Sequence, residues 1–212
     1  MSEILQEIAQ QLYAGKFNEV SALTQQALDQ SLAPAQILKG GLIAGMDTVG
    51  RDFKAGELYV PEVLVAAKAM HAGMDVLRPL LVGEDMPTTG RFLIGTVQGD
   101  LHDIGKNLVA MMLEGAGFEV FDLGINAAPG AFVEAIKDKE PQLVGMSALL
   151  TTTRDAMKVT IEAIAQAGLR DRIKIMVGGA PVTAKFAEEI GADGYAPDAG
   201  AAVDKARELI NA

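Results

Sequence analysis

The chain contains no cysteine and no tryptophan among its 212 residues, and aromatic residues make up only 5% of it. Without cysteine there can be no disulfide bond and no thiolate metal site. The 18 basic residues are outnumbered by 28 acidic ones, which leaves a formal net charge of −10. Such a chain offers no electrostatic footprint for nucleic acid or for an anionic membrane. We therefore expect no nucleic-acid and no membrane partner.

The sequence also has no apolar run that is long enough to span a bilayer. The first fifteen residues are acidic and amphipathic, and they lack the basic start and apolar run of a signal peptide. These two absences favour a cytoplasmic protein. Half of the residues are hydrophobic, and the chain also has 23 glycines, so we expect closely packed backbones around one or two cores.

Residues 1 to about 82 carry apolar side chains at helical spacing. The pattern predicts four helices, the third opened by Pro34 and the fourth by Pro61, because proline is tolerated in the first turn of a helix. Four such helices suit a small bundle. The polar stretch Val82–Gly90, with proline and glycine, is typical of a linker. We place a helical bundle at residues 1–86 and a second domain at residues 87–212.

After Gly90, short apolar runs alternate with helical segments. The predicted strands are Arg91–Gln98, Glu119–Leu123, Leu143–Leu149, Ile173–Val177 and Gly194–Ala196. The predicted helices are Lys106–Ala116, Pro129–Lys139, Arg154–Ala167, Thr183–Ile190 and Ala199–Ile210. Buried strands that alternate with helices indicate an α/β domain with a doubly wound, parallel, five-stranded sheet.

Ligands of open α/β sheets bind beyond the carboxyl ends of the strands. Glycines, hydroxyl residues, one leucine and one Asp/His pair lie at the ends of the predicted strands or just after them: Gly99, Asp100, His102, Gly124, Ser147, Leu149, Thr151, Thr152, Thr153, Gly178 and Gly179. Glycine after a strand is also common turn chemistry, and Ser or Thr before a helix is a common cap. Their coincidence at one edge nevertheless favours a binding site.

Two nucleotide-binding motifs can be tested against the loop after the first strand. Gly99 to Asn107 resembles a phosphate loop, but five residues separate its glycines, and Asn107 replaces the Ser or Thr that binds Mg²⁺. A G-x-G-x-x-G dinucleotide fingerprint is absent after the strand. The sequence therefore supports neither of the two nucleotide-binding motifs.

His102 is one of two histidines in the chain. In an extended loop, residues i and i+2 project to the same side, so Asp100 can accept a hydrogen bond from one ring nitrogen of His102. The other nitrogen is then free to bind a metal. A single imidazole cannot hold bare Zn²⁺, so the metal would arrive with its own equatorial ligands, as in a macrocycle. The alternative is a loop histidine that caps the following helix.

These residues resemble a known family. The series D-x-H-x-x-G, S-x-L and G-G is the signature of cobalamin-binding domains that hold the cofactor base-off and histidine-on. Here it comprises Asp100, Leu101, His102, Asp103, Ile104 and Gly105, then Ser147 and Leu149, then Gly178 and Gly179. Residues 45–70 resemble the helical cap of such proteins. The resemblance therefore implies a four-helix cap followed by a flavodoxin-like (Rossmann-like) domain, similar to the cobalamin-binding module of methionine synthase.

The resemblance also implies roles for individual residues. His102 would be the lower axial ligand of cobalt, and Asp100 would hold its ring and share its proton. Thr153 matches a hydroxyl that extends this relay. Ser147, Leu149, Gly178 and Gly179, with Thr151 as a further candidate, would line the slot for the displaced nucleotide tail of the cofactor. Tyr59, Val60, Leu64 and Met70 would cover the methyl group, although ordinary core packing is the more common role of apolar residues there.

A two-domain chain of this kind resembles the corrinoid proteins of multi-component methyltransferase systems. The resemblance implies a non-catalytic carrier of a methyl group on cobalamin. Its implied partners are a substrate-specific methyltransferase, a second methyltransferase dependent on tetrahydrofolate or coenzyme M, and a reductive activase. Three alternatives stay open: a cobalamin-binding sensor, a detached subunit of an adenosylcobalamin isomerase, and a flavodoxin-like receiver or flavin domain without cobalamin. The acidic N-terminal half argues against the sensor, and the cap argues against the isomerase.

Overall fold

The computed structural model describes residues 2–81 and 88–212. The chain divides into two compact units. The helical unit comprises Met1–Thr88 and Gly115–Gly117, and the α/β unit comprises Thr89–Glu114 and Phe118–Ala212. Most of the predicted linker, and with it the predicted boundary at residues 86 and 87, lies outside the described residues, so that boundary stays a prediction.

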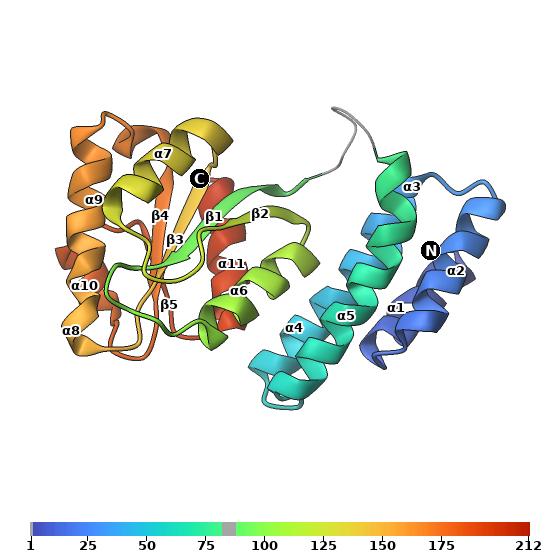
Figure 1. The fold of residues 1–212 in the computed structure, drawn as a ribbon. Coiled ribbons are helices and arrows are strands. Elements are labelled where there is room, and N and C mark those ends of the chain that lie inside the picture. The colour runs from blue at the N-terminus through green and yellow to red at the C-terminus, as the bar shows by residue number, and fades with distance from the viewer. Residues whose placement is uncertain (1, 82–87) are drawn as a thin grey trace. The chain divides into compact units, whose positions relative to one another are not determined.

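The helical unit contains the predicted bundle (Figure 1). Its elements are α1 (Glu3–Tyr13), α2 (Phe17–Asp29), α3 (Pro34–Ile37), the π-helix η1 (Leu38–Ile43), α4 (Ala44–Lys54), α5 (Val60–Leu77) and the 3₁₀-helix η2 (Arg78–Leu80). The segments α3, η1 and α4 follow one another without a break and replace the single predicted third helix. Pro34 is the first residue of α3 and Pro61 the second of α5, which confirms both predicted helix starts.

Glycines let the helices of this unit approach one another closely. A Cβ added at Gly41 would lie 3.0 Å from Ile8 Cγ2, and one added at Gly45 would lie 3.2 Å from the backbone of Ala9. Both neighbours belong to α1, so the α1 backbone lies against a glycine stripe on η1 and α4. This is the close backbone packing that the glycine content predicted.

The α/β unit alternates strands with helices throughout (Figure 1). The strands are β1 (Gly90–Thr96), β2 (Phe118–Asp122), β3 (Leu143–Ser147), β4 (Lys174–Gly178) and β5 (Gly194–Ala196). The helices are α6 (Ile104–Gly115), α7 (Pro129–Lys139), α8 (Thr151–Arg154), α9 (Ala156–Gln166), η3 (Arg170–Arg172), α10 (Ala184–Glu189) and α11 (Ala199–Ile210). Across the described residues, no helix is both long enough and apolar enough to cross a membrane.

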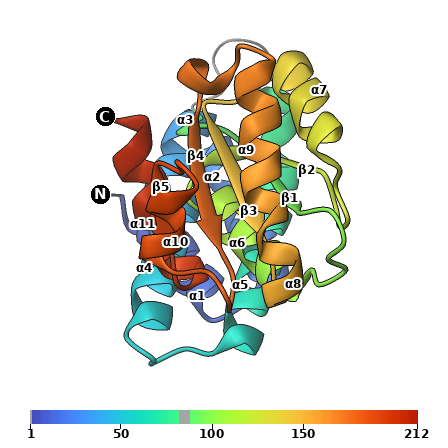
Figure 2. The ribbon, with the colours of Figure 1, turned by 90° about the vertical axis from the view of Figure 1, so that its left-hand side faces the viewer.

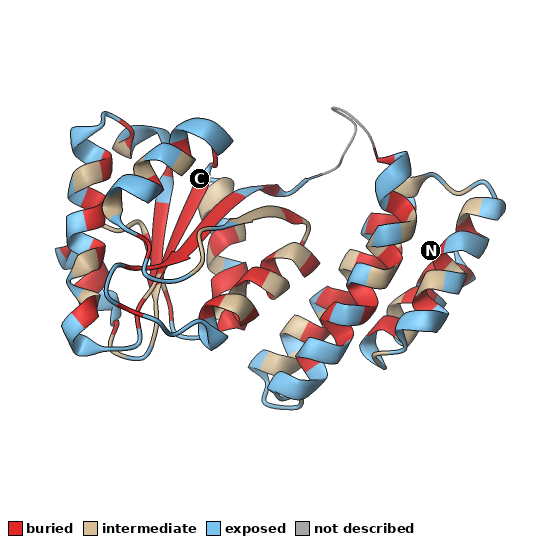
Figure 3. Ribbon diagram, in the orientation of Figure 1, coloured by how far each residue is buried: buried red, intermediate tan, exposed pale blue. Residues whose placement is uncertain are grey.

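The five strands are all parallel and lie in the order β2-β1-β3-β4-β5. Helices α7, α9 and α10 lie on one face of the sheet, and α6 and α11 lie on the other (Figure 1). A view turned by 90° shows α7 and α9 side by side over the sheet (Figure 2). Strands β1 and β3 are buried almost throughout, strand β2 is mostly half-buried, and the helices are buried along one stripe (Figure 3). This is the doubly wound sheet that the strand–helix alternation predicted.

The sheet order places the topological switch point between β1 and β3. The chain leaves β1 for β2 on one side and then returns to β3 on the other. The loops after β1 and β3 therefore diverge, and ligands of such sheets bind in the crevice that they leave at the carboxyl edge. The candidate residues Asp100 and Leu149 belong to these two loops.

Several predicted element ends differ from the structure by one or more residues. Strand β3 ends at Ser147 instead of Leu149, because the Leu149 N–H leaves the ladder and donates to the side chain of Asp100. The predicted helix Arg154–Ala167 begins earlier, at Thr151, and is divided at Asp155 into α8 and α9. Helix α6 begins at Ile104, two residues before the predicted start.

Candidate functional site

The loop between β1 and α6 is held in a tight turn where it leaves the sheet. Gly99 has a φ of +87°, which a glycine adopts without strain. The buried hydroxyl of Thr96, the last residue of β1, donates to the His102 carbonyl over 2.9 Å. The loop is therefore folded back on the end of its own strand, with Asp100 and His102 presented at the carboxyl edge.

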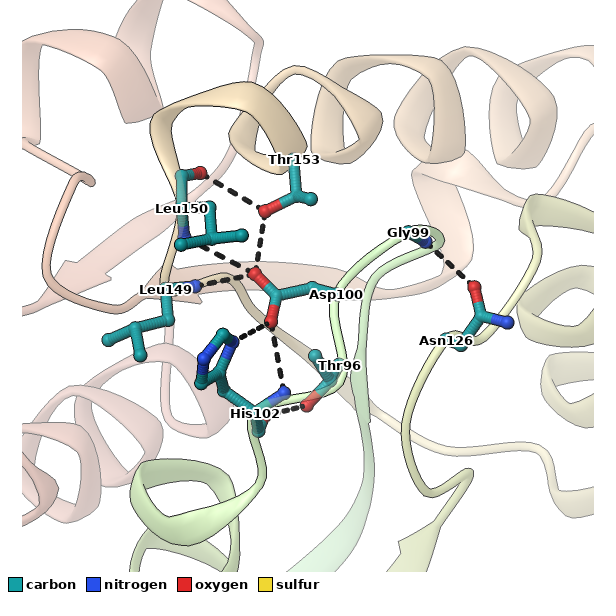
Figure 4. A network of polar contacts seen from close by, with 8 residues as sticks. All are labelled: Thr96, Gly99, Asp100, His102, Asn126, Leu149, Leu150 and Thr153. Carbon is teal, nitrogen blue, oxygen red and sulfur yellow. Dashed lines mark hydrogen bonds and ion pairs between the residues drawn. The ribbon is translucent and has the colours of Figure 1, made fainter.

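Asp100 is the centre of the polar network at this edge (Figure 4). Its side chain is fully buried. One carboxylate oxygen accepts the backbone N–H and ring Nδ1 of His102, over 3.0 and 2.7 Å. The other accepts Leu149 N–H at 2.8 Å, Leu150 N–H at 3.3 Å and the Thr153 hydroxyl at 2.6 Å. One carboxylate thus ties the loop after β1 to the loop and helix after β3.

This environment keeps Asp100 ionised. Burial by itself raises the pKa of the carboxyl group, but the hydrogen bonds from Thr153, His102 and Leu149 favour the charged form and outweigh it. The net result is a pKa well below the ordinary range of an aspartate. An ionised carboxylate only accepts hydrogen bonds, so the contacting Nδ1 of His102 must carry a proton.

The hydrogen bond predicted between Asp100 and His102 is therefore present, and it selects the tautomer of the ring. With Nδ1 protonated, Nε2 of the neutral imidazole has a free electron pair. Figure 4 shows Nε2 turned away from Asp100, and the His102 side chain is 49% exposed. A fixed, half-exposed imidazole of this kind is suited to bind a metal through Nε2.

No group of three or more His, Cys, Asp or Glu side chains in the described part of the chain could hold a metal ion. The single imidazole therefore suits a metal that brings its other ligands with it. The loops around His102 expose large apolar side chains to match: Leu101 and Ile104 after β1, Ile125 after β2, and Leu149 and Leu150 after β3. Ile104 is 79% exposed although it begins a helix. Such an apolar rim around one metal ligand fits a flat, largely apolar macrocycle.

Gly105 supports the same interpretation. It is the second residue of α6, its φ is not positive, and an added Cβ would meet no atom within 4 Å. Glycine weakens a helix relative to alanine, so one without a steric or conformational reason is unexpected here. A ligand that packs against the start of α6 would supply that reason, and the residues present therefore fit a corrin ring.

Gly178 and Gly179, in contrast, have steric reasons within the chain. A Cβ at Gly179 would lie 1.9 Å from the Ala148 carbonyl oxygen, and its φ is +119°. A Cβ at Gly178 would lie 2.9 Å from the Ala196 carbonyl oxygen. The pair thus allows β4 to end close to its neighbours. Ser147 is the last residue of β3 and is half-buried. The role of these three residues toward a ligand stays a prediction.

The four apolar candidates of the helical unit differ in burial. Tyr59 precedes α5 and is 69% exposed, and Val60 and Leu64 are also exposed. Core packing therefore does not account for these three side chains. Met70 is 4% exposed and belongs to the core of the unit. The assignment of all four to the cofactor stays a prediction.

The phosphate-loop alternative is excluded by the position of Lys106. Its side chain is buried, and its ammonium group donates to Asp122 at the end of β2 and to Asn107 Oδ1 at 2.6 Å. A lysine engaged in this way is not available to a bound phosphate. Lys106 instead ties the start of α6 to the end of β2.

Sequence reasoning missed three contributors to the site, namely Thr96, Leu150 and Asn126. Asn126 lies in the loop after β2, and its side chain accepts the Gly99 N–H at 2.7 Å. Thr96 donates its hydroxyl to the backbone carbonyl of His102, and Leu150 donates its backbone N–H to the Asp100 carboxylate. None belongs to a recognisable motif, and only the position of each at the end of a strand or in the loop that follows one could have signalled it.

Comparison with known proteins decides the family. A model described as a B12 binding domain matches residues 90–204, and another with the same description matches residues 4–78. The dimethylamine corrinoid protein of Methanosarcina barkeri is 44% identical over 209 residues, which cover 98% of each chain. The chain belongs to the corrinoid protein family. Its cofactor is cobalamin or a related corrinoid.

Solved structures support the assignment of this chain to the corrinoid protein family. A cobalamin-binding protein from Desulfitobacterium hafniense DCB-2 matches with a TM-score of 0.79 and 31% identity, over 97% of this chain and 98% of that one. The methanol:cobalamin methyltransferase complex of Methanosarcina barkeri matches with a TM-score of 0.90 and 28% identity, over 99% of this chain and 80% of that one. The flavodoxin-like alternative without cobalamin is therefore wrong.

Proposed function

We propose that this corrinoid protein carries a methyl group on cobalamin between two methyltransferases. One removes the group from a small methylated substrate, and the other delivers it to tetrahydrofolate or coenzyme M. The relatives named above include a dimethylamine corrinoid protein and a methanol:cobalamin methyltransferase complex, which supports membership in such a system. A reductive activase completes the proposed set of partners. The chain itself is proposed to be a carrier without catalytic residues.

The observation that carries this proposal is the free Nε2 of His102 within an apolar rim at the switch point of the sheet. We assign His102 as the lower axial ligand of the cobalt, in place of the cofactor's own base. When bound, the cobalt supplies a centre that accepts a methyl group and releases it again. Asp100 orients the imidazole and holds the Nδ1 proton, and Thr153 in turn orients Asp100 by its own hydrogen bond.

The other site residues are proposed to shape the binding surface. Leu101, Ile104 and Leu149 are exposed apolar side chains that suit contact with the corrin ring. Gly105 leaves room at the start of α6. Ser147 and Gly178 end β3 and β4, and Thr151 and Gly179 follow these strands, where the displaced nucleotide tail would be accommodated. Asp103 accepts a hydrogen bond from Asn107 at 3.2 Å, which supports the first turn of α6.

The visible spectrum of the protein loaded with methylcobalamin tests the assignment of His102. We expect a bound corrinoid whose own base is displaced, and a changed spectrum in His102→Ala. The chain offers a matched control in His71→Ala, since His71 is its only other histidine. Identical spectra of the native protein and His102→Ala would show that His102 is not the cobalt ligand.

The carrier role needs a separate test. Protein loaded with labelled methylcobalamin is expected to pass the label to tetrahydrofolate or coenzyme M only when the second methyltransferase is added. Transfer by the chain alone would make it an enzyme and contradict the carrier role. Retention of the label with both methyltransferases present would contradict the proposed function itself.

A further inference from the structure

We infer that Asn126 is a positioning residue for the cobalt ligand, acting on His102 through Gly99 and Asp100. Asn126 lies in the loop between β2 and α7, 24 positions after His102 in the chain, and touches neither the imidazole nor the Asp100 carboxylate in the contacts described above. The inference rests on the proposed function, in which His102 binds cobalt. It adds a residue that no motif of the family signature contains.

The contacts of Asn126 clamp the turn that carries Asp100. Its Oδ1 accepts the Gly99 N–H at 2.7 Å, and its own backbone N–H donates to the Asp100 carbonyl at 3.0 Å. The next residue, Ala127, forms a parallel bridge with Val97 just beyond the end of β1. Residues 126 and 127 thus extend the pairing of the sheet into the loop and hold the Gly99–Asp100 segment from the side of β2 (Figure 4).

The backbone conformation of Asn126 explains why this residue type suits the position. Its φ is +52°, in the left-handed region that Asn tolerates better than most residues with a side chain. Glycine would adopt the same conformation without strain but would have no side-chain acceptor. Asparagine is the residue that combines the left-handed backbone with an acceptor for Gly99 N–H.

Asp100 is consequently held between two loops. Asn126 fixes its backbone from the side of β2, and Leu149, Leu150 and Thr153 fix its carboxylate from the side of β3. The imidazole of His102 is oriented by that carboxylate. Loss of the Asn126 contact would let the Gly99–Asp100 turn move, and the ring would lose part of its preorganisation for the metal.

Three variants separate the side-chain contact from the backbone conformation. Asn126→Gly removes the acceptor and keeps the left-handed backbone strain-free. Asn126→Asp keeps an oxygen at the position of the acceptor. Glu140→Gly is the matched control, because Glu140 has a φ of +45° in the same unit and ends α7. It reports the effect of a new glycine in a left-handed position without touching the site.

Each variant is loaded with cobalamin, and the ratio of histidine-bound to histidine-free cobalt is measured at fixed pH. Visible absorption and the nitrogen splitting in the paramagnetic resonance spectrum of the Co(II) form both report this ratio. We expect Asn126→Gly to lower it by about tenfold, the effect of one lost hydrogen bond. In Asn126→Asp and Glu140→Gly, this ratio should stay within about twofold of the native ratio, which is the smallest change expected from one hydrogen bond.

The measurements distinguish a failure of this inference from a failure of the proposed function. A native ratio in Asn126→Gly overturns the inference, and so does an equal fall in Glu140→Gly, which would indicate a general effect of glycine. A lower melting temperature with an unchanged ratio also overturns it, since Asn126 would then be structural only. If the native protein and His102→Ala already share one spectrum, the failure belongs to the proposed function. In the apoprotein, faster hydrogen exchange at the Gly99 N–H in Asn126→Gly supports the inference without any cofactor.

Discussion

The physical reason for a glycine differs from one position of the candidate site to another. Gly179 combines a φ of +119° with a steric limit, because a Cβ would lie 1.9 Å from the Ala148 carbonyl oxygen. The fold of the chain alone requires glycine there. Gly105 has neither reason, since its φ is not positive and no atom lies within 4 Å of an added Cβ. A bound corrinoid is the reason that we propose for Gly105, and the two glycines can be separated by experiment.

The first prediction at this scale concerns Gly105→Ala. Alanine is favoured over glycine in a helix, so we expect the apoprotein to gain up to about 1 kcal/mol in free energy of unfolding. Corrinoid binding should weaken, because the added methyl group occupies the surface where the ring packs. Chemical denaturation of the apoprotein and titration with cobalamin measure the two effects.

Gly130→Ala is the control for that prediction. Gly130 is the second residue of α7, and an added Cβ there also meets nothing within 4 Å. It should stabilise the apoprotein in the same way and leave corrinoid binding unchanged. Native affinity in Gly105→Ala would contradict a ligand at the start of α6.

The second residue-scale prediction concerns the pH dependence of stability at Asp100. The native pKa of this carboxyl group is lowered relative to its unfolded value of about 3.9. Its contribution to the free energy of unfolding is therefore fully present above the unfolded pKa and is lost as the pH falls through the native pKa. In Asp100→Asn, the fall in stability on acidification from about pH 5 to pH 2 should be shallower. Denaturant unfolding at a series of pH values measures this slope, and an unchanged slope would contradict the lowered pKa.

At the scale of elements, the helical unit depends on the contact between α1 and α4. Gly45 lies where the two helices approach, and a Cβ there would be 3.2 Å from the Ala9 backbone. Neighbouring backbone cannot rotate out of the way as a side chain can. The stability of this unit is therefore sensitive to size at a glycine that belongs to no cofactor motif.

We predict that Gly45→Val destabilises the protein by about 1–3 kcal/mol, the usual cost of overpacking a core. Arg51→Val, on the exposed face of the same helix, should change the free energy of unfolding by about 0.5 kcal/mol or less. Thermal and denaturant unfolding of both variants test this pair. Equal effects would indicate that helix propensity, and not the close approach of α1, controls the result.

At the scale of the whole molecule, the α/β unit has an apolar core of its own. One apolar cluster joins residues of the sheet to α7, α9 and α10 and lies entirely within the α/β unit. All the hydrogen bonds that position His102 are also internal to that unit. The imidazole is therefore held independently of the helical unit.

A chain of residues 87–212 is accordingly predicted to fold and to bind cobalamin with histidine coordination. Circular dichroism should report mixed helix and strand, and the visible spectrum should change on His102→Ala as in the full chain. A truncated chain that is unfolded would contradict both the predicted boundary at residues 86 and 87 and the independence of the site.

Local patterns along the chain were enough to predict most elements. The period of the apolar residues distinguished helices from strands, and α7 (Pro129–Lys139) and α11 (Ala199–Ile210) were predicted to the residue. The bond between Asp100 and His102 could be predicted as well, because the two residues are only two positions apart. Such features depend on neighbours in sequence, which periodicity and spacing encode directly.

Only the tertiary structure decided what surrounds that pair. The second oxygen of Asp100 accepts hydrogen bonds from residues 49 to 53 positions away, and Asn126 contacts Gly99 from the loop after β2. These contacts follow from the order β2-β1-β3, in which loops distant in sequence meet at one edge of the sheet. The sequence by itself determined the α/β class and the histidine motif. Non-local strand pairing, which no spacing encodes, decided the geometry that orients the histidine.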